Sequence, residues 1–292
     1  MSASIFDDDA SPKGEPQAAE TQSAHARGLG TPRVHLRQTS STNDRARELA
    51  SAGAPHGTLV TADEQTAGRG RGGRRWSAPA GSSLLMSLVL RSPPVLLPLI
   101  AAVAACEAVG EQALIKWPND IVVAAGGETP THPPLAKLAG ILIEGRPQQG
   151  WAVLGIGLNV AVRLEELPAE LRSDGAPAEP AGSAPAESAG SDAEAAPAHA
   201  GLPAATLGLP RSQLEPMLRR LLDALARRLA EPEQATLAAW RARDALRGRE
   251  VAWDAGHGRA DGIDGTGRLI LALEDGGRTS LGSGEVRLAR IS

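Results

Sequence analysis

The sequence predicts an α+β protein in which interspersed strands and helices precede a small β-barrel module. Between residues 34 and 247, short apolar runs typical of strands alternate with segments of helical periodicity. From Arg249 onward the pattern changes to five short strand-like runs separated by Gly and Asp turns. Strands this short and this closely spaced are typical of a small barrel, so we expect two structural parts in this 292-residue chain.

The first half of the chain combines two helices with apolar strands. Thr42 or Asn43 can cap a helix that runs to about Ala52. An apolar segment over 96–109 predicts a buried helix, and two apolar runs joined by Gly145 to Gly150 predict a hairpin. The strands expected in this half are 58–62, 83–90, 113–117, 121–123, 138–144 and 151–160.

The second half begins with helices and ends with strands. Segments 211–230 and 232–246 have helical periodicity, and the first carries leucines on one face with arginines opposite. Gly265 to Gly267 and Asp275 to Gly277 are hairpin turn signals. The five expected C-terminal strands are 250–253, 259–263, 269–273, 278–281 and 286–289.

Two segments lack the side chains needed for a core. Residues 1–33 are mostly small or polar, and 173–201 contain no Val, Ile or aromatic residue and no Leu. Such segments cannot bury enough apolar surface to offset the entropy of ordering. We therefore expect a disordered N-terminal tail and a flexible insertion in a surface loop.

Net charge, cysteine content and the distribution of apolar residues exclude several classes of protein. The net charge of −4 provides no global basic field for nucleic acid. Cys106 is the only cysteine, which excludes an intramolecular disulfide. Asp7 to Asp9 occupy the place of a signal-peptide apolar segment, and the apolar run 95–109 is interrupted by Pro98 and Glu107. We expect a cytoplasmic protein that binds neither nucleic acid nor membrane.

The most informative stretch is a loop that combines arginine with glycine. Four arginines and four glycines lie within Gly68 to Arg75. Glycine lets the backbone approach a ligand closely, and arginine pairs with carboxylate or phosphate. The loop therefore predicts a local anion site, although a solvated turn or a disordered RNA-binding patch would have a similar composition.

Three further motifs end core elements with polar groups. A lysine, a tryptophan and an Asn-Asp pair lie together in 116–120, a lysine begins the apolar run 137–144, and Asn159 ends another. Polar groups at strand ends are typical of a binding site at the edge of a sheet.

Taken together, these motifs resemble the biotin–protein ligase family. The matching segments are Ser41-Thr42-Asn43, Gly68 to Arg71 with Trp76, Lys116 to Asp120, Lys137 to Leu142, and Gly157 to Asn159. The resemblance implies a mixed sheet like that of class II aminoacyl-tRNA synthetases and an SH3-like C-terminal barrel. It implies a catalytic domain over 34–247 and a C-terminal domain over 248–292. Only about 33 residues precede Val34, so we expect the monofunctional class, without a DNA-binding domain.

The resemblance implies the activity biotin–[acetyl-CoA-carboxylase] ligase. Biotin reacts with ATP to give biotinyl-5′-AMP, and a lysine of a biotin carboxyl carrier protein then accepts the biotin. ATP use implies Mg²⁺, held mainly by phosphates rather than by a protein metal site. Whether the chain forms a homodimer is left open.

The resemblance also implies roles for individual residues. Lys137 and Arg71 are expected to be catalytic. Biotin is expected to contact Ser41, Thr42, Asn43, Gln65, Arg69, Gly70, Arg71 and Lys137. ATP or the adenylate is expected to contact Arg74, Arg75, Trp76, Asn119, Asp120 and Asn159.

Each assignment has a structural alternative. Lys137 could be a solvent-facing strand end, and Arg74 with Arg75 a solvated charge run. Ser41 to Asn43 could serve as an N-cap, Asn119 with Asp120 as a turn, and Trp76 as an anchor for the loop. At the level of function, a lipoate–protein ligase or octanoyltransferase is the nearest alternative, and an Arg-rich nucleic-acid-binding module or an inactive biotin-binding regulator would be other classes.

Overall fold

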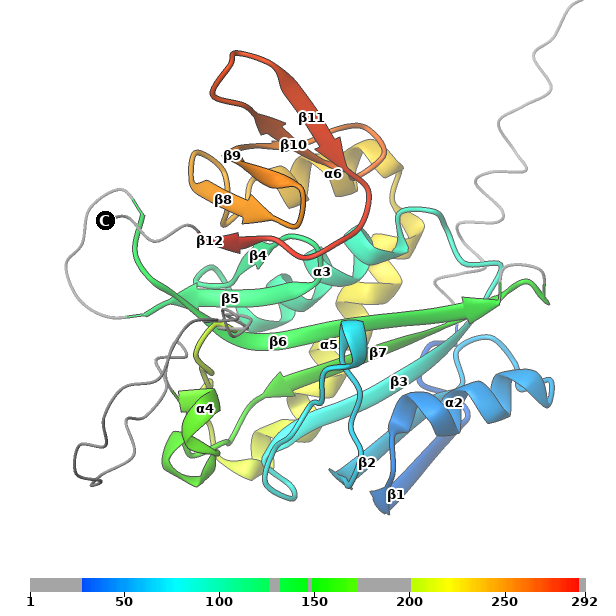
Figure 1. Cartoon of the computed structure of the whole chain (residues 1–292). Helices are drawn as coiled ribbons and strands as arrows, with labels where there is room; N and C mark the ends of the chain where they lie inside the picture. The colour runs from blue at the N-terminus through cyan, green and yellow to red at the C-terminus, as the bar shows by residue number, and fades with distance from the viewer. Residues whose placement is uncertain (1–27, 126–131, 147–148, 173–200, 289–292) are drawn as a thin grey trace, which may run out of the picture.

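The computed structural model describes residues 28–125, 132–146, 149–172 and 201–288. Most of the expected tail 1–33 and nearly all of the expected insertion 173–201 lie outside these described residues. The described chain forms a seven-stranded sheet and a five-stranded sheet (Figure 1). The α+β class is therefore confirmed.

The seven-stranded sheet has the order β1-β2-β3-β7-β6-β5-β4. Only β1 and β2 pair in parallel, and every other neighbouring pair in this sheet is antiparallel. Its strands are β1 (Arg33–Thr39), β2 (Leu59–Gln65), β3 (Ser83–Arg91), β4 (Leu114–Lys116), β5 (Asp120–Ala124), β6 (Leu135–Arg146) and β7 (Trp151–Asn159).

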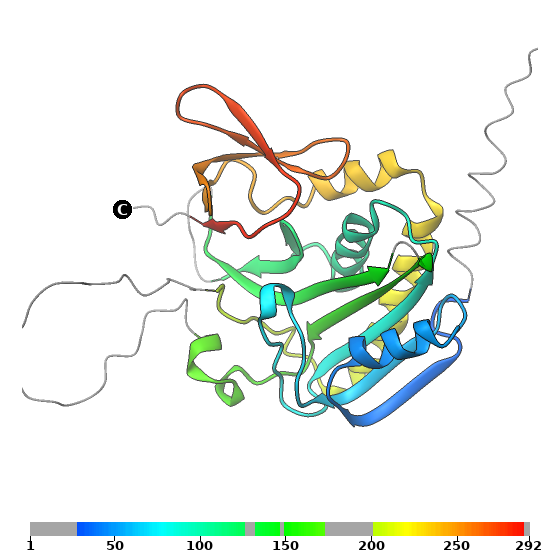
Figure 2. The same cartoon turned by 45° about the vertical axis from the view of Figure 1, so that its right-hand side comes forward.

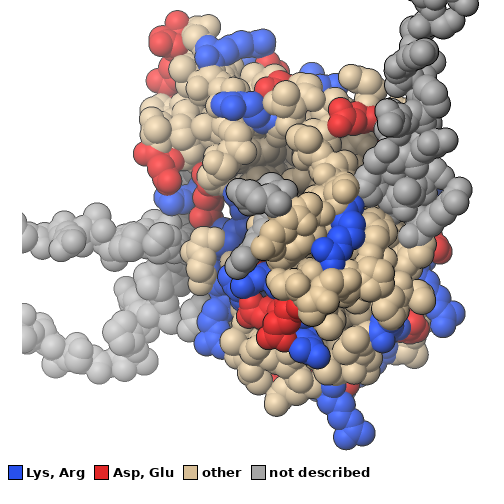
Figure 3. Space-filling model, turned by 90° about the vertical axis from the view of Figure 1, so that its right-hand side faces the viewer, with Lys and Arg blue, Asp and Glu red and all other residues tan. Residues whose placement is uncertain are grey.

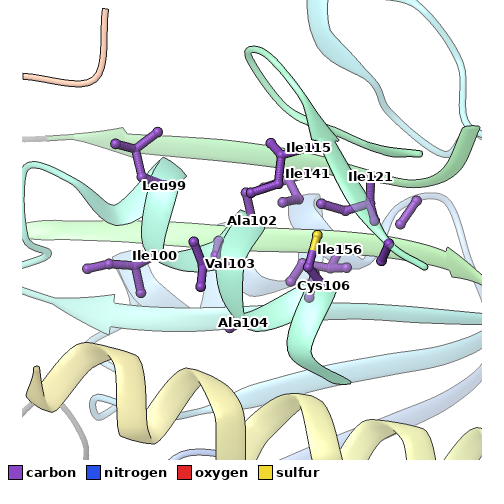
Figure 4. Close-up of a cluster of buried hydrophobic side chains, with 14 of the residues drawn as sticks. Leu99, Ile100, Ala102, Val103, Ala104, Cys106, Ile115, Ile121, Ile141 and Ile156 are labelled. Carbon is purple, nitrogen blue, oxygen red and sulfur yellow. The ribbon is translucent and has the colours of Figure 1, made fainter. Parts of the chain in front are cut away.

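Helices cover both faces of this sheet, as Figure 2 shows. Helix α2 (Thr42–Ser51) packs on β2, β3 and β7, whereas α3 (Leu97–Val109) lies on the other face between the sheet and α5 (Leu214–Ala230). Apolar side chains of α3 meet isoleucines of β4, β5, β6 and β7 in the main core (Figure 4). The expected apolar stripe of α5 is buried at Leu218, Leu221, Leu225 and Leu229.

The five-stranded sheet agrees closely with the predicted C-terminal module. It has the order β11-β10-β9-β8-β12 and is antiparallel throughout. Its strands are β8 (Glu250–Trp253), β9 (Gly256–Ile263), β10 (Leu269–Ala272), β11 (Arg278–Leu281) and β12 (Arg287–Leu288), and the sheet fits an SH3-like domain. Because Gly and Asp turns delimit each strand, the local sequence was sufficient to place them.

Three local expectations were wrong. Strand β1 was not predicted, because an edge strand that alternates half-buried and exposed residues has few apolar side chains. Ser41 rather than Thr42 or Asn43 is the N-cap of α2, and it makes no side-chain cap bond. Helix α6 (Glu233–Arg241) ends before residue 246, because the following backbone pairs with β4 through Ile115 N to Arg243 O and Ala245 N to Ile115 O. Short helical pieces at 71–73, 164–166 and 169–172 were also not predicted, and the first residues of the expected helix 211–230 form a separate 3-10 turn at 211–213.

The C-terminal module packs directly on the large sheet. The Lys116 ammonium donates to the Val286 carbonyl at 2.8 Å, and the Trp117 indole donates to the Gly267 carbonyl at 3.2 Å. Val251, Leu269 and Leu271 of the module belong to the main apolar core. Within the described residues, no helix is long and apolar enough to cross a membrane.

Asp244, in the segment between α6 and β8, should oppose folding at neutral pH. Burial raises the pKa of this carboxyl to about 6, although its Oδ1 accepts the Leu246 N–H at 2.9 Å. An acid whose folded pKa is raised destabilises the fold once it ionises, so this penalty is absent below its unfolded pKa near 4 and complete above about 6. Between pH 4 and 7.5, the free energy of unfolding of Asp244→Asn should therefore gain about 2–3 kcal/mol relative to the parent protein.

Urea unfolding at a series of pH values measures this gain. Asp254→Asn, at an exposed carboxyl of the C-terminal module, is the control and should follow the parent profile. Parallel pH profiles for Asp244→Asn and the parent protein would contradict the assignment.

Candidate functional site

A cavity of about 960 Å³ lies where the start of α2, the Arg- and Gly-rich loop, strands β6 and β7 and the C-terminal module meet. In Figures 1 and 2 the loop carries the short helix η1 (Arg71–Gly73) across β6. Of the residues predicted for the site, those that line the cavity are Ser41, Thr42, Asn43, Gln65, Arg69, Gly70, Arg71, Arg74, Arg75, Trp76, Asn119, Asp120 and Lys137.

The start of α2 brings polar groups of three elements together. The Thr42 backbone N–H and hydroxyl both donate to Gln65 Oε1, at 2.7 and 3.0 Å. The Asn43 amide donates to Glu144 Oε2 at 2.9 Å, and its Oδ1 accepts from Ser87 at 2.6 Å. The Ser41 hydroxyl is buried and has no hydrogen-bond partner among the described residues. These contacts place an unsatisfied hydroxyl and a fixed amide network at one part of the cavity wall.

The loop differs from expectation in how its own polar groups are used. The Gly70 N–H, expected to meet a ligand, donates to the Arg74 carbonyl at 2.8 Å. Arg69 pairs with Asp44 at 2.6 Å and with Glu144 at 2.9 Å. Two carboxylates therefore already neutralise Arg69, and the Gly70 N–H is already satisfied within the loop.

The remaining loop arginines reach other parts of the protein. Arg75 donates to the Thr66 carbonyl at 2.7 Å, and Arg74 pairs with Glu285 of the C-terminal module at 2.5 Å. Both guanidinium groups thus have a partner within the protein, although both side chains are exposed.

Lys137, Asp120 and Arg71 form the charged part of the cavity. Lys137 Nζ lies 2.7 Å from Asp120 Oδ1 as an ion pair, although it is not aligned as a hydrogen bond. Arg71 donates to Asn119 Oδ1 at 3.3 Å, and burial lowers the pKa of its guanidinium while Asp120 opposes that shift. Lys137 is thus not a solvent-facing strand end, because it contributes to the cavity wall beside Arg71.

A bulge in β6 gives Lys137 this direction. The pairing of β5 with β6 shifts by one residue, so that Ile121 faces Ala139 while Val122 faces Lys137. An extra residue in a strand moves the side chains beyond it to the other face. As a result Lys137 lies on the same face as Gly140, whose ideal Cβ position is 3.4 Å from Lys137 Nζ.

The indole ring of Trp76 occupies a gap on the surface of the sheet, where two paired glycines have no side chains. Gly140 of β6 and Gly157 of β7 are directly paired, and a Cβ added to Gly157 would lie 2.5 Å from Trp76 Cε2. Lys137 Nζ is 5.8 Å from the centre of the indole ring. Because neither glycine has a side chain, the large ring can pack flat against the strands.

Asn159 is the one predicted site residue that does not line the cavity. Its amide donates to the Ala205 carbonyl at 2.9 Å and its oxygen accepts from Ser83 at 3.0 Å. Both polar groups therefore have partners within the protein, and the Ala205 contact joins the end of β7 to the segment 201–209.

Sequence reasoning gave no role to three charged residues near the cavity. Lys116 begins the motif 116–120 and is buried, and burial lowers the pKa of its ammonium. Asp44 and Glu144 hold Arg69, yet they lie 100 residues apart in the chain. Asp44 directly follows Asn43, and Glu144 ends the run 137–144. These positions beside two motifs were the only signal in the sequence that either residue belongs to the site.

Charge on the outside is mixed. On the face drawn in Figure 3, basic and acidic side chains are interspersed, so an extended polyanion would meet no continuous basic surface there. Within the described ranges, no group of three or more His, Cys, Asp or Glu residues could hold a metal ion.

Comparison with known proteins gives consistent matches. The sequence model of the Biotin/lipoate A/B protein ligase family matches residues 35–160. The biotin–[acetyl-CoA-carboxylase] ligase of Paracoccus denitrificans is 32% identical over 255 residues, covering 81% of this chain and 92% of that protein. The bifunctional ligase/repressor BirA of Bacillus subtilis is 43% identical over 145 residues, but the match covers only 42% of its length and 46% of this chain.

The fold comparison agrees with these sequence matches. Biotin protein ligase from Aquifex aeolicus, solved in complex with biotin and ATP, is similar with a TM-score of 0.64 and 22% identity, covering 89% of this chain and all of that chain. At this identity the likeness shows the fold, and it confirms the fold expected from the motifs.

Gly157→Ala should displace Trp76 from its place on the sheet. A methyl group cannot occupy a position 2.5 Å from a ring carbon without movement of the ring or strand. Such overpacking typically costs about 1–3 kcal/mol of stability. We expect this loss in chemical denaturation, together with a changed near-UV circular dichroism signal. Gly265→Ala is the matched control, because its Cβ would meet nothing within 4 Å. Equal stability of the two variants would show that Trp76 does not depend on the gap.

Proposed function

We propose, from the premise that this chain belongs to the biotin–protein ligase family, that it activates biotin with ATP and transfers it to a lysine of a carrier protein. The observation that carries the proposal is the composition of a single cavity wall. The wall combines the hydroxyl and amide groups at the start of α2 with the cations Arg71 and Lys137. It therefore offers hydrogen-bond partners for the neutral ureido ring of biotin and cations for its carboxylate and for a phosphate.

The first proposed step forms the adenylate. An oxygen of the biotin carboxylate attacks the α-phosphorus of ATP, the bond to the β-phosphate bridging oxygen breaks, and pyrophosphate leaves. Negative charge accumulates on the phosphoryl oxygens during this displacement. Cations held in a fixed position can stabilise that charge without reorganising, so no protein nucleophile is required.

The second proposed step transfers biotin to the carrier. The neutral amine of an acceptor lysine attacks the acyl carbon, AMP leaves, and an amide forms. We propose a biotin carboxyl carrier protein as the acceptor, with acetyl-CoA carboxylase as its parent enzyme, by analogy with the activity named for the Paracoccus denitrificans relative.

Lys137 and Arg71 are the proposed catalytic residues. Both are cations of the cavity wall, and each has a neighbouring polar partner that fixes its position, Asp120 for Lys137 and Asn119 for Arg71. A point ammonium and a forked guanidinium complement each other when a carboxylate approaches a phosphate. Ser41, Thr42, Asn43 and Gln65 are proposed to bind the ureido part of biotin.

Arg74, Arg75 and Trp76 are proposed to bind ATP or the adenylate. Arg74 would then exchange its pairing with Glu285 for a phosphate. Gly70 can contribute its N–H only if its bond to Arg74 opens, so its proposed contact with biotin depends on movement of the loop.

Mg²⁺ is proposed as the companion of ATP. The carboxylates that line this cavity are Asp120, Glu250 and Glu285, and Asp120 and Glu285 are paired with Lys137 and Arg74. The metal would therefore be held mainly by the phosphates, where it neutralises their charge.

Mass spectrometry of a carrier domain tests the proposed function. The isolated domain is incubated with the full chain, biotin, ATP and Mg²⁺, and we expect a mass gain equal to one biotinyl group. Omission of ATP should abolish the gain. A parallel reaction with lipoate distinguishes the nearest alternative, because modification by lipoate alone would show that the chain is a lipoate ligase.

Lys137→Ala should impair adenylate formation more than biotin binding. Loss of one preorganised electrostatic contact to a reacting centre typically costs about 10²–10³ in rate. We therefore expect a fall of this size in biotin-dependent pyrophosphate release, with a biotin Kd changed by less than about threefold in calorimetry. Arg219→Ala, which removes an exposed arginine of α5, should retain the parent rate. An unchanged rate for Lys137→Ala would remove Lys137 from the mechanism.

A further inference from the structure

Arg69 makes contacts unlike those of the other loop arginines. Its NH1 lies 2.6 Å from Asp44 Oδ1 and its NH2 lies 2.9 Å from Glu144 Oε1. The hydrogen bond that Arg69 donates to Asp44 raises the pKa of the Arg69 guanidinium, and the charge of Glu144 acts in the same direction. One guanidinium thus joins the loop to a helix and to a strand of the large sheet.

Glu144 connects this contact to the cavity wall. While its Oε1 pairs with Arg69, its Oε2 accepts the Asn43 amide at 2.9 Å. The Asn43 amide leaves no room for a side chain at residue 155, because a Cβ there would lie 2.1 Å from Asn43 Oδ1. A single carboxylate therefore positions both the loop and a residue proposed to bind biotin.

We infer that Arg69 is a positioning residue, which fastens the Arg- and Gly-rich loop over the cavity by pairing with Asp44 and Glu144, rather than a ligand of biotin. This group of three residues is called the Arg69 clasp below. The inference rests on the proposed function for its consequence, which is that the clasp keeps the adenylate in the cavity until the carrier lysine arrives.

Charge balance supports this role. Two carboxylates surround Arg69, whereas Arg71 contacts the neutral amide of Asn119 and retains its charge for a ligand. Arg47 adds a second cation, 3.0 Å from Asp44 and 3.5 Å from Glu144. Exposed ion pairs are individually worth little, but several that share partners form a network whose geometry is fixed. The same surroundings would desolvate and repel a third anion such as a biotin carboxylate.

The position of the clasp also suits closure of the loop. Among the described residues, the other loop arginines tie it to the turn at Asn119 and to Glu285. The contact with Glu285 is made by Arg74, which is proposed to turn toward a phosphate, so this contact would break when the ligand binds. Asp44 and Glu144 take part in neither of those contacts, so the clasp can persist throughout the reaction.

Hydrogen exchange in the absence of any ligand tests the clasp itself. We compare the parent protein with Asp44→Asn and Glu144→Gln, and measure the backbone amides of residues 66–76. Each variant should increase their exchange about fivefold, since a loss of about 1 kcal/mol in local stability changes an opening equilibrium by that factor. Glu48→Gln is the matched control, because it removes a carboxylate of α2 that pairs with Arg45 outside the clasp, and its exchange should match that of the parent.

Combining each carboxylate variant with Arg69→Met tests whether the carboxylates act on the loop through Arg69 or through a general loss of structure. In an Arg69→Met background, the two carboxylate variants should produce no further increase in exchange, because the shared contact has already been lost. Should Glu144→Gln fail to fold, Asp44→Asn in both backgrounds decides the question alone. Unchanged exchange in Asp44→Asn, or fully additive effects, would overturn the inference.

Adenylate release connects the clasp to the reaction. With biotin and ATP supplied, the ratio of AMP formed to biotin transferred should rise several-fold in Asp44→Asn and stay at the parent value in Glu48→Gln. An unchanged ratio alongside faster exchange would overturn the retention role. If the parent transfers no biotin at all, the proposed function fails, while the exchange experiment still decides whether the clasp holds the loop.

Discussion

The register of β6 against β7 is the constraint on which the site depends. Gly140 pairs with Gly157 and Leu142 pairs with Gly155, so the side-chain-free positions of the two strands lie together under Trp76 and Asn43. A slip of one residue would move each β6 side chain to the opposite face. It would direct Glu144 into the apolar layer under α3 and remove the partner of Arg69. The apolar residues that fix this register, Ile141 and Ile156, are directly paired in the main core, so packing on one face sets the chemistry on the other.

Charge in the cavity is organised in pairs rather than as a basic field. Lys137 has Asp120, Arg74 has Glu285, and Arg69 has two carboxylates. A cation held by such a pair can exchange its partner for an anionic ligand when the ligand offers more oxygen atoms. Arg71 is the exception, because its nearest partner is an amide and burial lowers its pKa. This arrangement explains how a chain with a negative net charge can form a site for anions.

The sequence was informative where structure is encoded locally. The strands of the C-terminal module were predicted almost residue by residue, because each lies between Gly or Asp turns. Most of the site residues could also be placed in one cavity from their motifs. What could not be predicted depends on partners distant in the chain. The contacts of Arg69 with Glu144 and of Asn159 with Ala205 could not be predicted, because nothing near either residue in the sequence reveals its partner. The bulge that turns Lys137 into the cavity, and the pairing with β4 that ends α6 early, also arise only when distant strands meet.

The bond from Lys116 to Val286 has a consequence for how the molecule is held together. Lys116 ends β4, its ammonium is almost fully buried, and it donates to a carbonyl near the end of the C-terminal module. Separation of the two sheets would break this bond and would also expose to water the apolar side chains that the sheets bury between them. Apolar residues of both sheets also share one core. The two sheets therefore behave as one cooperative unit, in which the C-terminal module completes the apolar core of the larger domain.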